Sequence, residues 1–347
     1  MSLKPVEVVR KTATRRDVEK EAYLTGVLSV KCTTESYLHV GTRRVKFSID
    51  ETLFTKYRGE IDYNFLVRTS RNYVTYEYTE VVRYGNKVVI PGSTLKGCVR
   101  SRLELLAVSR DDKTHFCFRV SDIPRVFPPR KGQHGWRHYR IWEPSVGERR
   151  ISTDGREACD TTRGDYRVCV TCDLFGAPGL ASRVLFENLY ATVCELLSLR
   201  LDHNEKVEAV KPRTVFSGRI VFRNLRPYEL GLIFIGLGAE PSGGFKTILL
   251  GKSKYRQRIV EECPQDRSLE GGPIDLGLVR FSIERILVNS RLYDVEEDSL
   301  HQGFYLYSDS SKLRGIVVKA VREASEMFPE LRVDFSEVKA REEVKQA

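Results

Sequence analysis

The chain has 347 residues and a net charge of +10, with Lys and Arg outnumbering Asp and Glu by 57 to 47. That length buries a sizeable core in one large or two ordinary domains, and the basic balance suits an anionic partner without requiring one. The longest apolar run, Leu230–Ala239, is too short to cross a membrane, and the charged N-terminus lacks the apolar region of a signal peptide. We therefore expect a cytoplasmic protein with no membrane partner. Its 30% charged residues and scarce methionine are typical of proteins from hot environments.

The first third of the chain combines an extension, a strand and a polar region. Residues 1–20 are basic and lack a sustained apolar period, which indicates an N-terminal extension. From residue 22 the alternation of apolar and polar residues predicts a strand that ends at His39-Val40-Gly41. A His at a strand end is more often a hydrogen-bonded surface residue than a catalyst. Basic residues and tyrosines interleave over 42–87, which suits either single-stranded nucleic acid or a tyrosine-rich hairpin with a charged face.

The central segment, residues 88–108, predicts a strand, a Pro-Gly turn and a helix with Ser93 as its N-cap. Apolar residues at helical spacing give this helix one core face. Lys96 and Arg100, with Arg102 beside them, lie on the other side, where like charges repel and favour an anion. A glycine turn before a helix N-terminus also presents backbone N–H groups to a phosphate. A solvated basic face remains the alternative.

Residues 110–180 differ in composition from the rest of the chain, being rich in Pro, Gly, Trp, His and Arg. We interpret them as an inserted lid. Cysteines of a cytosolic protein are more often core residues or metal ligands than disulfides. A His-x-Cys pair and a Cys-x-x-Cys pair favour a structural zinc site, because an insertion with little core of its own needs a staple. Simple packing of the cysteines is the alternative. The predicted ligands are His115, Cys117, Cys169 and Cys172, with Cys159 or His134 as substitutes.

The last third returns to regular structure. The pattern predicts a strand over 183–186, a core helix over 227–238, a strand over 276–288 and a helical tail from Ser310. Between the helix and the last strand, glycines alternate with Lys246, Lys252 and Lys254, which allows backbone N–H groups to approach phosphates. The segment lacks the spacing of a P-loop, so we exclude a nucleotide hydrolase.

Two separated blocks resemble the RAMP superfamily, the repeat-associated proteins of CRISPR RNA-guided complexes. The first is Ile90–Gly97, reading IPGSTLKG, and the second joins Leu174-Phe175-Gly176 to Ala181–Asn188, reading ASRVLFEN. Together they are similar to the backbone subunit of type III interference complexes, over roughly residues 22 to 290. His39-Val40-Gly41 is similar to the end of the family's first strand.

Two βαβ-like halves predict an α+β fold with a ferredoxin-like core, as in RNA recognition motifs, and the resemblance implies the same fold. To this core we add the predicted zinc-stabilised lid and additional helical segments. We expect the core at 21–109 and 181–309, the extension at 1–20, the lid at 110–180 and the tail at 310–347. Phosphate contacts are expected to dominate binding, since a subunit that holds any guide leaves sequence to base pairing. The expected RNA-binding residues are Ser93, Lys96, Arg100, Arg102, Arg183, Arg213, Lys246, Lys252 and Lys254.

The implied function is a subunit that oligomerises along single-stranded CRISPR RNA beside other effector-complex subunits. In the family, an acidic residue after the first strand cuts target RNA with a divalent metal, here Mg²⁺. Asp62 in Gly59-Glu60-Ile61-Asp62 matches that motif, and Asp50 is the alternative. Whether this chain cuts target RNA stays open. A generic basic RNA-binding protein with no catalytic role is the competing hypothesis, which the two motif blocks disfavour.

Overall fold

The computed structural model describes residues 6–19, 22–49, 62, 74–118, 128–133, 135–148, 158–202, 205–255, 258–259 and 273–346. This part of the chain contains both strands and helices, with runs of strands between the helices, which confirms the mixed α+β class. None of its helices combines the length and hydrophobicity that crossing a membrane requires.

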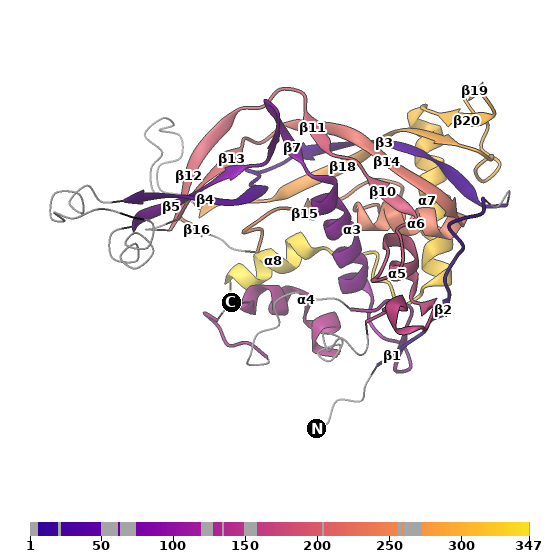
Figure 1. Cartoon of the computed structure of the whole chain (residues 1–347), viewed down its shortest axis with the longest axis horizontal. Helices are drawn as coiled ribbons and strands as arrows, with labels where there is room; N and C mark the ends of the chain where they lie inside the picture. The colour runs from indigo at the N-terminus through magenta and orange to yellow at the C-terminus, as the bar shows by residue number, and fades with distance from the viewer. Residues whose placement is uncertain are drawn as a thin grey trace.

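A ten-stranded sheet is the largest sheet of the described structure (Figure 1). Its order is β19-β20-β18-β3-β14-β11-β7-β6, with β10 also pairing β14 and β15 also pairing β18. The strands are β3 (Leu24–Thr34), β6 (Arg83–Tyr84), β7 (Lys87–Ile90), β10 (Val184–Phe186), β11 (Leu189–Ala191), β14 (Val215–Leu225), β15 (Ile248–Leu249), β18 (Leu278–Val288), β19 (Ser299–His301) and β20 (Phe304–Tyr307). Strand β3 lies antiparallel to both β14 and β18, so the predicted first strand occupies the centre of the sheet.

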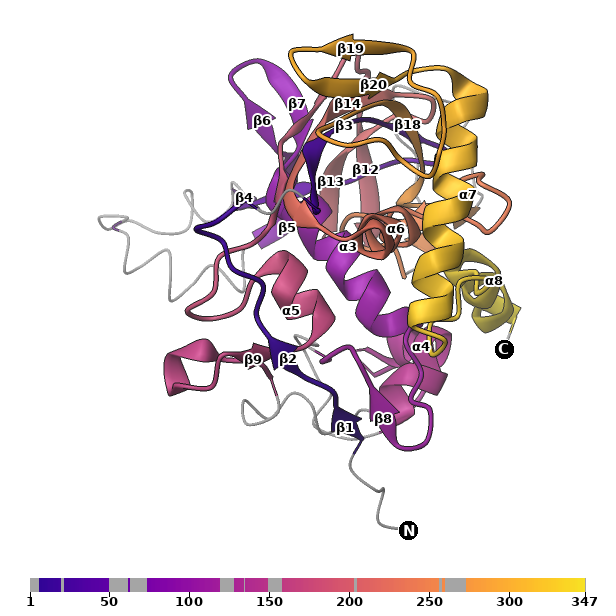
Figure 2. The same cartoon turned by 90° about the vertical axis from the view of Figure 1, so that its right-hand side faces the viewer.

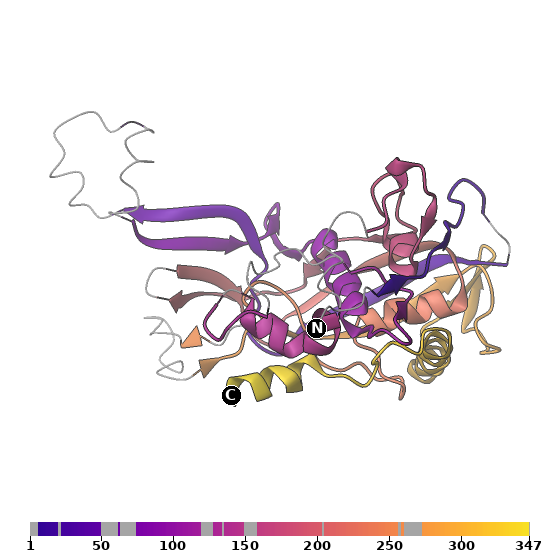
Figure 3. The ribbon, with the colours of Figure 1, turned by 90° about the horizontal axis from the view of Figure 1, so that it is seen from below.

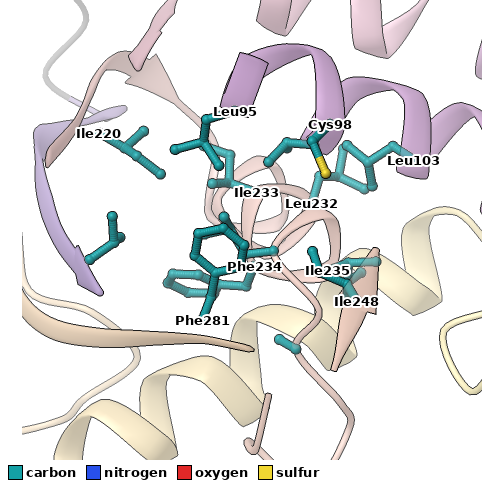
Figure 4. Close-up of a cluster of buried hydrophobic side chains, with 14 of the residues drawn as sticks. Leu95, Cys98, Leu103, Ile220, Leu232, Ile233, Phe234, Ile235, Ile248 and Phe281 are labelled. Atoms are coloured by element: carbon teal, nitrogen blue, oxygen red, sulfur yellow. The ribbon is translucent and has the colours of Figure 1, made fainter. Parts of the chain in front are cut away.

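Alternation in sequence explains how the sheet buries one face. Every second residue of β3, from Leu24 to Thr34, is buried, and those between are half-buried. Helices α3 (Gly92–Leu106), α6 (Pro227–Gly236) and α7 (Ser310–Met327) supply the covering layer. Figure 4 shows part of this core, in which Leu95 of α3, Phe234 of α6 and Phe281 of β18 belong to one cluster of buried side chains. The predicted helices at 227 and 310 are confirmed, and both belong to this one core.

The structure differs from the sequence prediction in two details. Helix α3 begins at Gly92 with Pro91 as its N-cap, so Ser93 is not the cap but an exposed residue of the first turn. Position 92 requires glycine because a Cβ there would lie 1.9 Å from the carbonyl oxygen of Phe186. The strand expected at 276–288 is β18, and it is not the last, since β19 and β20 follow it.

A second, four-stranded sheet projects from the first. It comprises β4 (Gly41–Ile49), β5 (Val74–Val81), β12 (Leu196–Asp202) and β13 (Glu205–Val210), in the order β12-β13-β5-β4. Figure 3 shows the β4–β5 hairpin extending away from the helical layer. Leu199 and Val207 belong to its own small core, which Leu276 completes. The polar region after the first strand thus contributes two strands of a separate sheet.

The region 110–180 contains more helix than its sequence suggests. It holds helix α4 (Trp136–Glu148) and the short α5 (Val170–Phe175), together with the short strands β8 (Lys113–Thr114) and β9 (Arg167–Val168). The N-terminal segment adds β1 (Glu7–Val8) beside β8 and β2 (Lys11–Thr12) beside β9 (Figure 2). The remaining elements are a 3₁₀ turn at Thr161–Arg163, the pair β16 (Arg258–Ile259) and β17 (Pro273–Ile274), and α8 (Glu337–Gln346), which packs on α4.

Candidate nucleic-acid interface and metal centre

A pocket of about 260 Å³ lies where three separated sequence blocks meet. Helix α3 forms one wall, the glycine-rich segment after α6 forms another, and the start of β4 closes the end. Its lining consists of Val40, Gly41, Thr94, Gly97, Cys98, Ser101, Leu250, Gly251, Lys252 and Lys254. Small residues, hydroxyls and lysines dominate this lining, and such a surface suits a phosphodiester backbone.

Two glycines of the pocket lining differ in what a side chain would contact there. Gly97 lies inside α3, and a Cβ there would meet no atom within 4 Å. Gly251 has φ of +91°, and a Cβ there would lie 2.6 Å from the carbonyl oxygen of His39. The backbone N–H of Lys252 donates to that same oxygen at 2.9 Å. The glycine-rich segment is thereby fixed against the end of the first-strand motif, with its lysines at the pocket.

His39, whose carbonyl oxygen accepts that hydrogen bond, is itself 1% exposed. It is therefore a buried residue and not the surface residue that its position at a strand end suggested. Its Nδ1 donates to the carbonyl oxygen of Glu208 at 2.6 Å, and its buried Nε2 has no hydrogen-bond partner within the described structure. Burial lowers the pKa of His39, which keeps the ring neutral near pH 7.

The lysines expected to bind RNA differ in their exposure and in the contacts that they already make. Lys252 is exposed, with its Nζ 3.3 Å from Glu205 Oε1. Lys254 is half-buried and donates to the carbonyl oxygen of Leu249 at 3.4 Å. Lys96 is half-buried and is not among the residues that line the pocket; burial followed by the Arg100 charge lowers its pKa. Anions that approach the pocket would therefore meet Lys252 first and Lys254 behind it.

The remaining surface candidates lie outside the pocket lining. Lys246 donates its Nζ to the carbonyl oxygen of Val333, so it tethers the C-terminal segment. Arg213 is exposed at the turn between β13 and β14, where its φ is +68°. Ser93 is exposed on the first turn of α3.

Two predicted RNA-binding arginines belong to the core. Arg102 is 3% exposed and makes a bidentate pair with Glu337 of α8, at 2.8 and 3.0 Å. Arg183 is 4% exposed, and its Nη2 lies 2.6 Å from both Asp173 and Glu229. Buried carboxylates neutralise both cationic groups, which the local sequence around either arginine does not reveal.

The two motif blocks contact one another directly. The backbone N–H of Gly92, at the start of α3, donates to Asn188 Oδ1 at 3.0 Å. Gly92 and Phe186 also approach so closely that no side chain fits between them. These motif residues therefore set the position of α3, and through it the pocket wall.

Asp62 is exposed and is not among the residues that line the pocket; the ranges on either side of it lie outside the described residues. Asp50 lies outside the described residues.

Four buried cysteines form a second site. The sulfur atoms of Cys117, Cys159, Cys169 and Cys172 all lie within 4.8 Å of one another. A tetrahedral site with Zn–S bonds of about 2.3 Å has S···S separations of about 3.8 Å, so the donor set and its spacing suit such an ion. Cys117 follows β8, and Cys169 and Cys172 open α5, where the Cys-x-x-Cys turn points both sulfurs the same way. This buried cluster can hold a metal ion.

The fourth residue of the cluster is Cys159 and not His115, the ligand that the sequence favoured. Cys159, predicted as a substitute, takes the position expected for His115. His115 instead places its Nδ1 2.9 Å from Glu330 Oε1, which ties it to the segment before α8. His134, the other substitute, lies outside the described residues. The His-x-Cys spacing was a weak guide because β8 ends at Thr114, so His115 and Cys117 do not share one face of a strand.

Arg100 belongs to this cluster and not to an exposed basic face. Its Nη2 donates to Cys172 Sγ at 3.1 Å, its Nη1 to the carbonyl oxygen of Gly176 at 2.9 Å and its Nε to Glu104 at 2.8 Å. Gly97 and Arg100 lie three residues apart on α3, so neighbouring parts of the helix surface face the pocket and the cysteine cluster.

The fold and the two sites define an α+β protein with a lysine-bearing, glycine-lined pocket beside a four-cysteine cluster. The model of the RAMP superfamily matches residues 31–262, and the chain belongs to that family. No curated protein matches the chain. Among solved structures it is similar to the crystal structure of Thermofilum pendens Csc2, with a TM-score of 0.36, 16% sequence identity, and coverage of 95% of this chain and 91% of that chain.

Proposed function

We propose that the chain is a CRISPR RNA-binding backbone subunit of a type III effector complex, and that its RNA backbone contacts centre on the pocket beside α3. Membership of the RAMP superfamily supports the general role. The single observation that carries the site is the convergence of three separated sequence blocks on one lining that includes Lys252 and Lys254. The proposal extends to self-association along the guide and to contacts with target RNA and other subunits.

The strand connectivity supports a ferredoxin-like core as part of this proposal. Strands β3, β10, β14 and β18 lie in the order β18-β3-β14-β10, all antiparallel neighbours, with α3 after the first strand and α6 after the third. That is the order of a split βαβ arrangement. In this proposal the projecting sheet, the region 110–180 and the helical tail are additions to that core.

The binding mode predicts strong dependence on salt and little dependence on sequence. Fluorescence anisotropy with single-stranded RNAs of guide length and unrelated sequence measures both. Removing one phosphate-binding cation reduces the steepness of log K against log salt by about 0.7 for a single strand. We expect Lys252→Gln to lower both the affinity and this steepness.

A matched control separates a site from a general charge effect. Lys319→Gln removes the same charge from an exposed position on α7, where the Nζ donates to the carbonyl oxygen of Tyr293. It should leave affinity nearly unchanged. Equal effects of the two variants, or an affinity that stays flat between low and moderate salt, would contradict the pocket. Arg100→Ala is a poor probe because it also disturbs the cysteine cluster.

For the cluster we propose a structural zinc ion held by Cys117, Cys159, Cys169 and Cys172. Bound zinc would join the segments that carry these cysteines and would cross-link them. Zinc analysis of protein purified without chelator should find one ion per chain. Chelation should loosen residues 110–180 while the ten-stranded sheet keeps its far-UV circular dichroism.

Target cleavage would depend on the acidic residue after the first strand. That Asp would position Mg²⁺ at the scissile phosphate, with the neighbouring ribose hydroxyl as nucleophile. The exposure of Asp62 is compatible with such a role in an assembled complex. The residue would act on RNA held by neighbouring subunits, since in-line attack needs a fixed geometry.

A further inference from the structure

The N-terminal segment 6–19, here called the strap, lies against the cysteine cluster. It runs between the two segments that deliver three of the four cysteines: β1 pairs with β8, just before Cys117, and β2 pairs with β9, just before Cys169. Figure 2 shows the strap passing along both pairs on its way from the N-terminus to the sheet. Val8 and Ala13 pack against the cysteines themselves.

Two arginines from different parts of the chain contact the cysteine cluster. Arg10, in the strap, hydrogen-bonds Cys159, and Arg100, in α3, donates to Cys172 at 3.1 Å. Four thiolates around a divalent cation leave two excess negative charges. A buried dianion is costly unless cations or hydrogen-bond donors compensate it. The two guanidinium groups supply that compensation, one from each element.

The far end of the strap is fixed by polar contacts of its own. Thr14 donates from its backbone N–H and its hydroxyl to the two carboxylate oxygens of Asp173, at 3.0 and 2.8 Å. Arg16 donates to the same carboxylate at 2.8 Å. Because Asp173 directly follows Cys172, these bonds hold the strap against the first turn of α5.

We propose that the strap is an integral wall of the metal centre, in which Arg10 acts as a positioning residue that retains the ion and the ion in turn holds the strap in place. This inference rests on the proposed metal occupancy of the cluster. Groups that hydrogen-bond metal ligands typically change metal affinity 10- to 100-fold. Loss of the ion would also let the cysteines take up protons, and Arg10 would lose the negative charge of its partner Cys159.

The test combines metal affinity with backbone protection in the full chain. Zinc affinity is measured by competition with a chromogenic chelator, and hydrogen exchange is followed at the amides of Val9 and Ala13, which bond Thr114 and Tyr166. Arg10→Ala should weaken zinc binding by about 10- to 100-fold and speed exchange at both amides. Arg10→Lys should recover part of each loss. Removing zinc from the wild-type protein should speed the same amides.

Arg15→Ala is the matched control, since Arg15 is an exposed strap residue whose side chain pairs with Asp17. It should change neither readout. Equal zinc affinities for Arg10→Ala and Arg15→Ala, or unchanged exchange after zinc removal, would overturn the role of the strap while leaving zinc binding intact. A wild-type protein without stoichiometric zinc would overturn the metal assignment itself.

Discussion

Gly97 offers a test in which stability and binding should move in opposite directions. It is an exposed residue in the interior of α3, where glycine costs a helix about 1 kcal/mol relative to alanine. A Cβ at this position meets no atom within 4 Å, so Gly97→Ala creates no clash in the free protein. We therefore expect Gly97→Ala to raise the free energy of unfolding by about 1 kcal/mol, measured by urea denaturation.

The same methyl group would project into the pocket. If an RNA backbone lies against α3 there, the methyl displaces it and weakens the phosphate contacts of Lys252 or Lys254. Loss of one charge-assisted hydrogen bond costs about 1.5–3 kcal/mol, which is roughly a 10- to 100-fold loss of affinity. Anisotropy titrations at fixed salt measure it directly.

Gly315 provides the control, because it lies within helix α7 and a Cβ there also meets no atom within 4 Å. Gly315→Ala should give a similar gain in stability and no change in RNA affinity. If Gly97→Ala binds RNA as tightly as the wild-type protein does, the pocket is not where the backbone lies, and the reasoning from its lining fails.

Three further outcomes follow from buried or exposed charges. Arg102→Met should destabilise the protein by about 3–5 kcal/mol because it strands the buried carboxylate of Glu337, and adding Glu337→Leu should recover most of the loss in urea unfolding. Burial and the Lys254 charge lower the pKa of His138 to about 4, so below about pH 6.5 the unfolded chain binds a proton that the folded protein does not. The free energy of unfolding should thus fall by about 2 kcal/mol between pH 7 and 5, and His138→Phe should remove that part of the dependence. In a guide-loaded assembly with Mg²⁺, Asp62→Ala should abolish target cleavage and leave target binding within a few-fold; cleavage lost with Asp50→Ala instead would transfer the role to Asp50.

Local patterns in the sequence were sufficient to predict the main strands and helices and the family to which they belong. The alternation in β3 and the helical spacing of α3 and α7 each report one surface that must be buried, and the continuous apolar run of α6 reports a helix that is buried from Glu229 to Gly236. A single segment carries that information in each case. The Cys-x-x-Cys turn is equally local, so Cys169 and Cys172 were identified as a pair of neighbouring sulfurs.

The roles of the charged residues, in contrast, depend on contacts between distant segments. Lys96, Arg100 and Arg102 look alike in sequence, yet Arg100 meets a sulfur 72 positions away and Arg102 a carboxylate 235 positions away. The choice of Cys159 over His115 depends in the same way on which segments the fold brings together. A charge reveals its need for a partner but not which distant residue supplies it, because the partner is selected by packing across the whole chain.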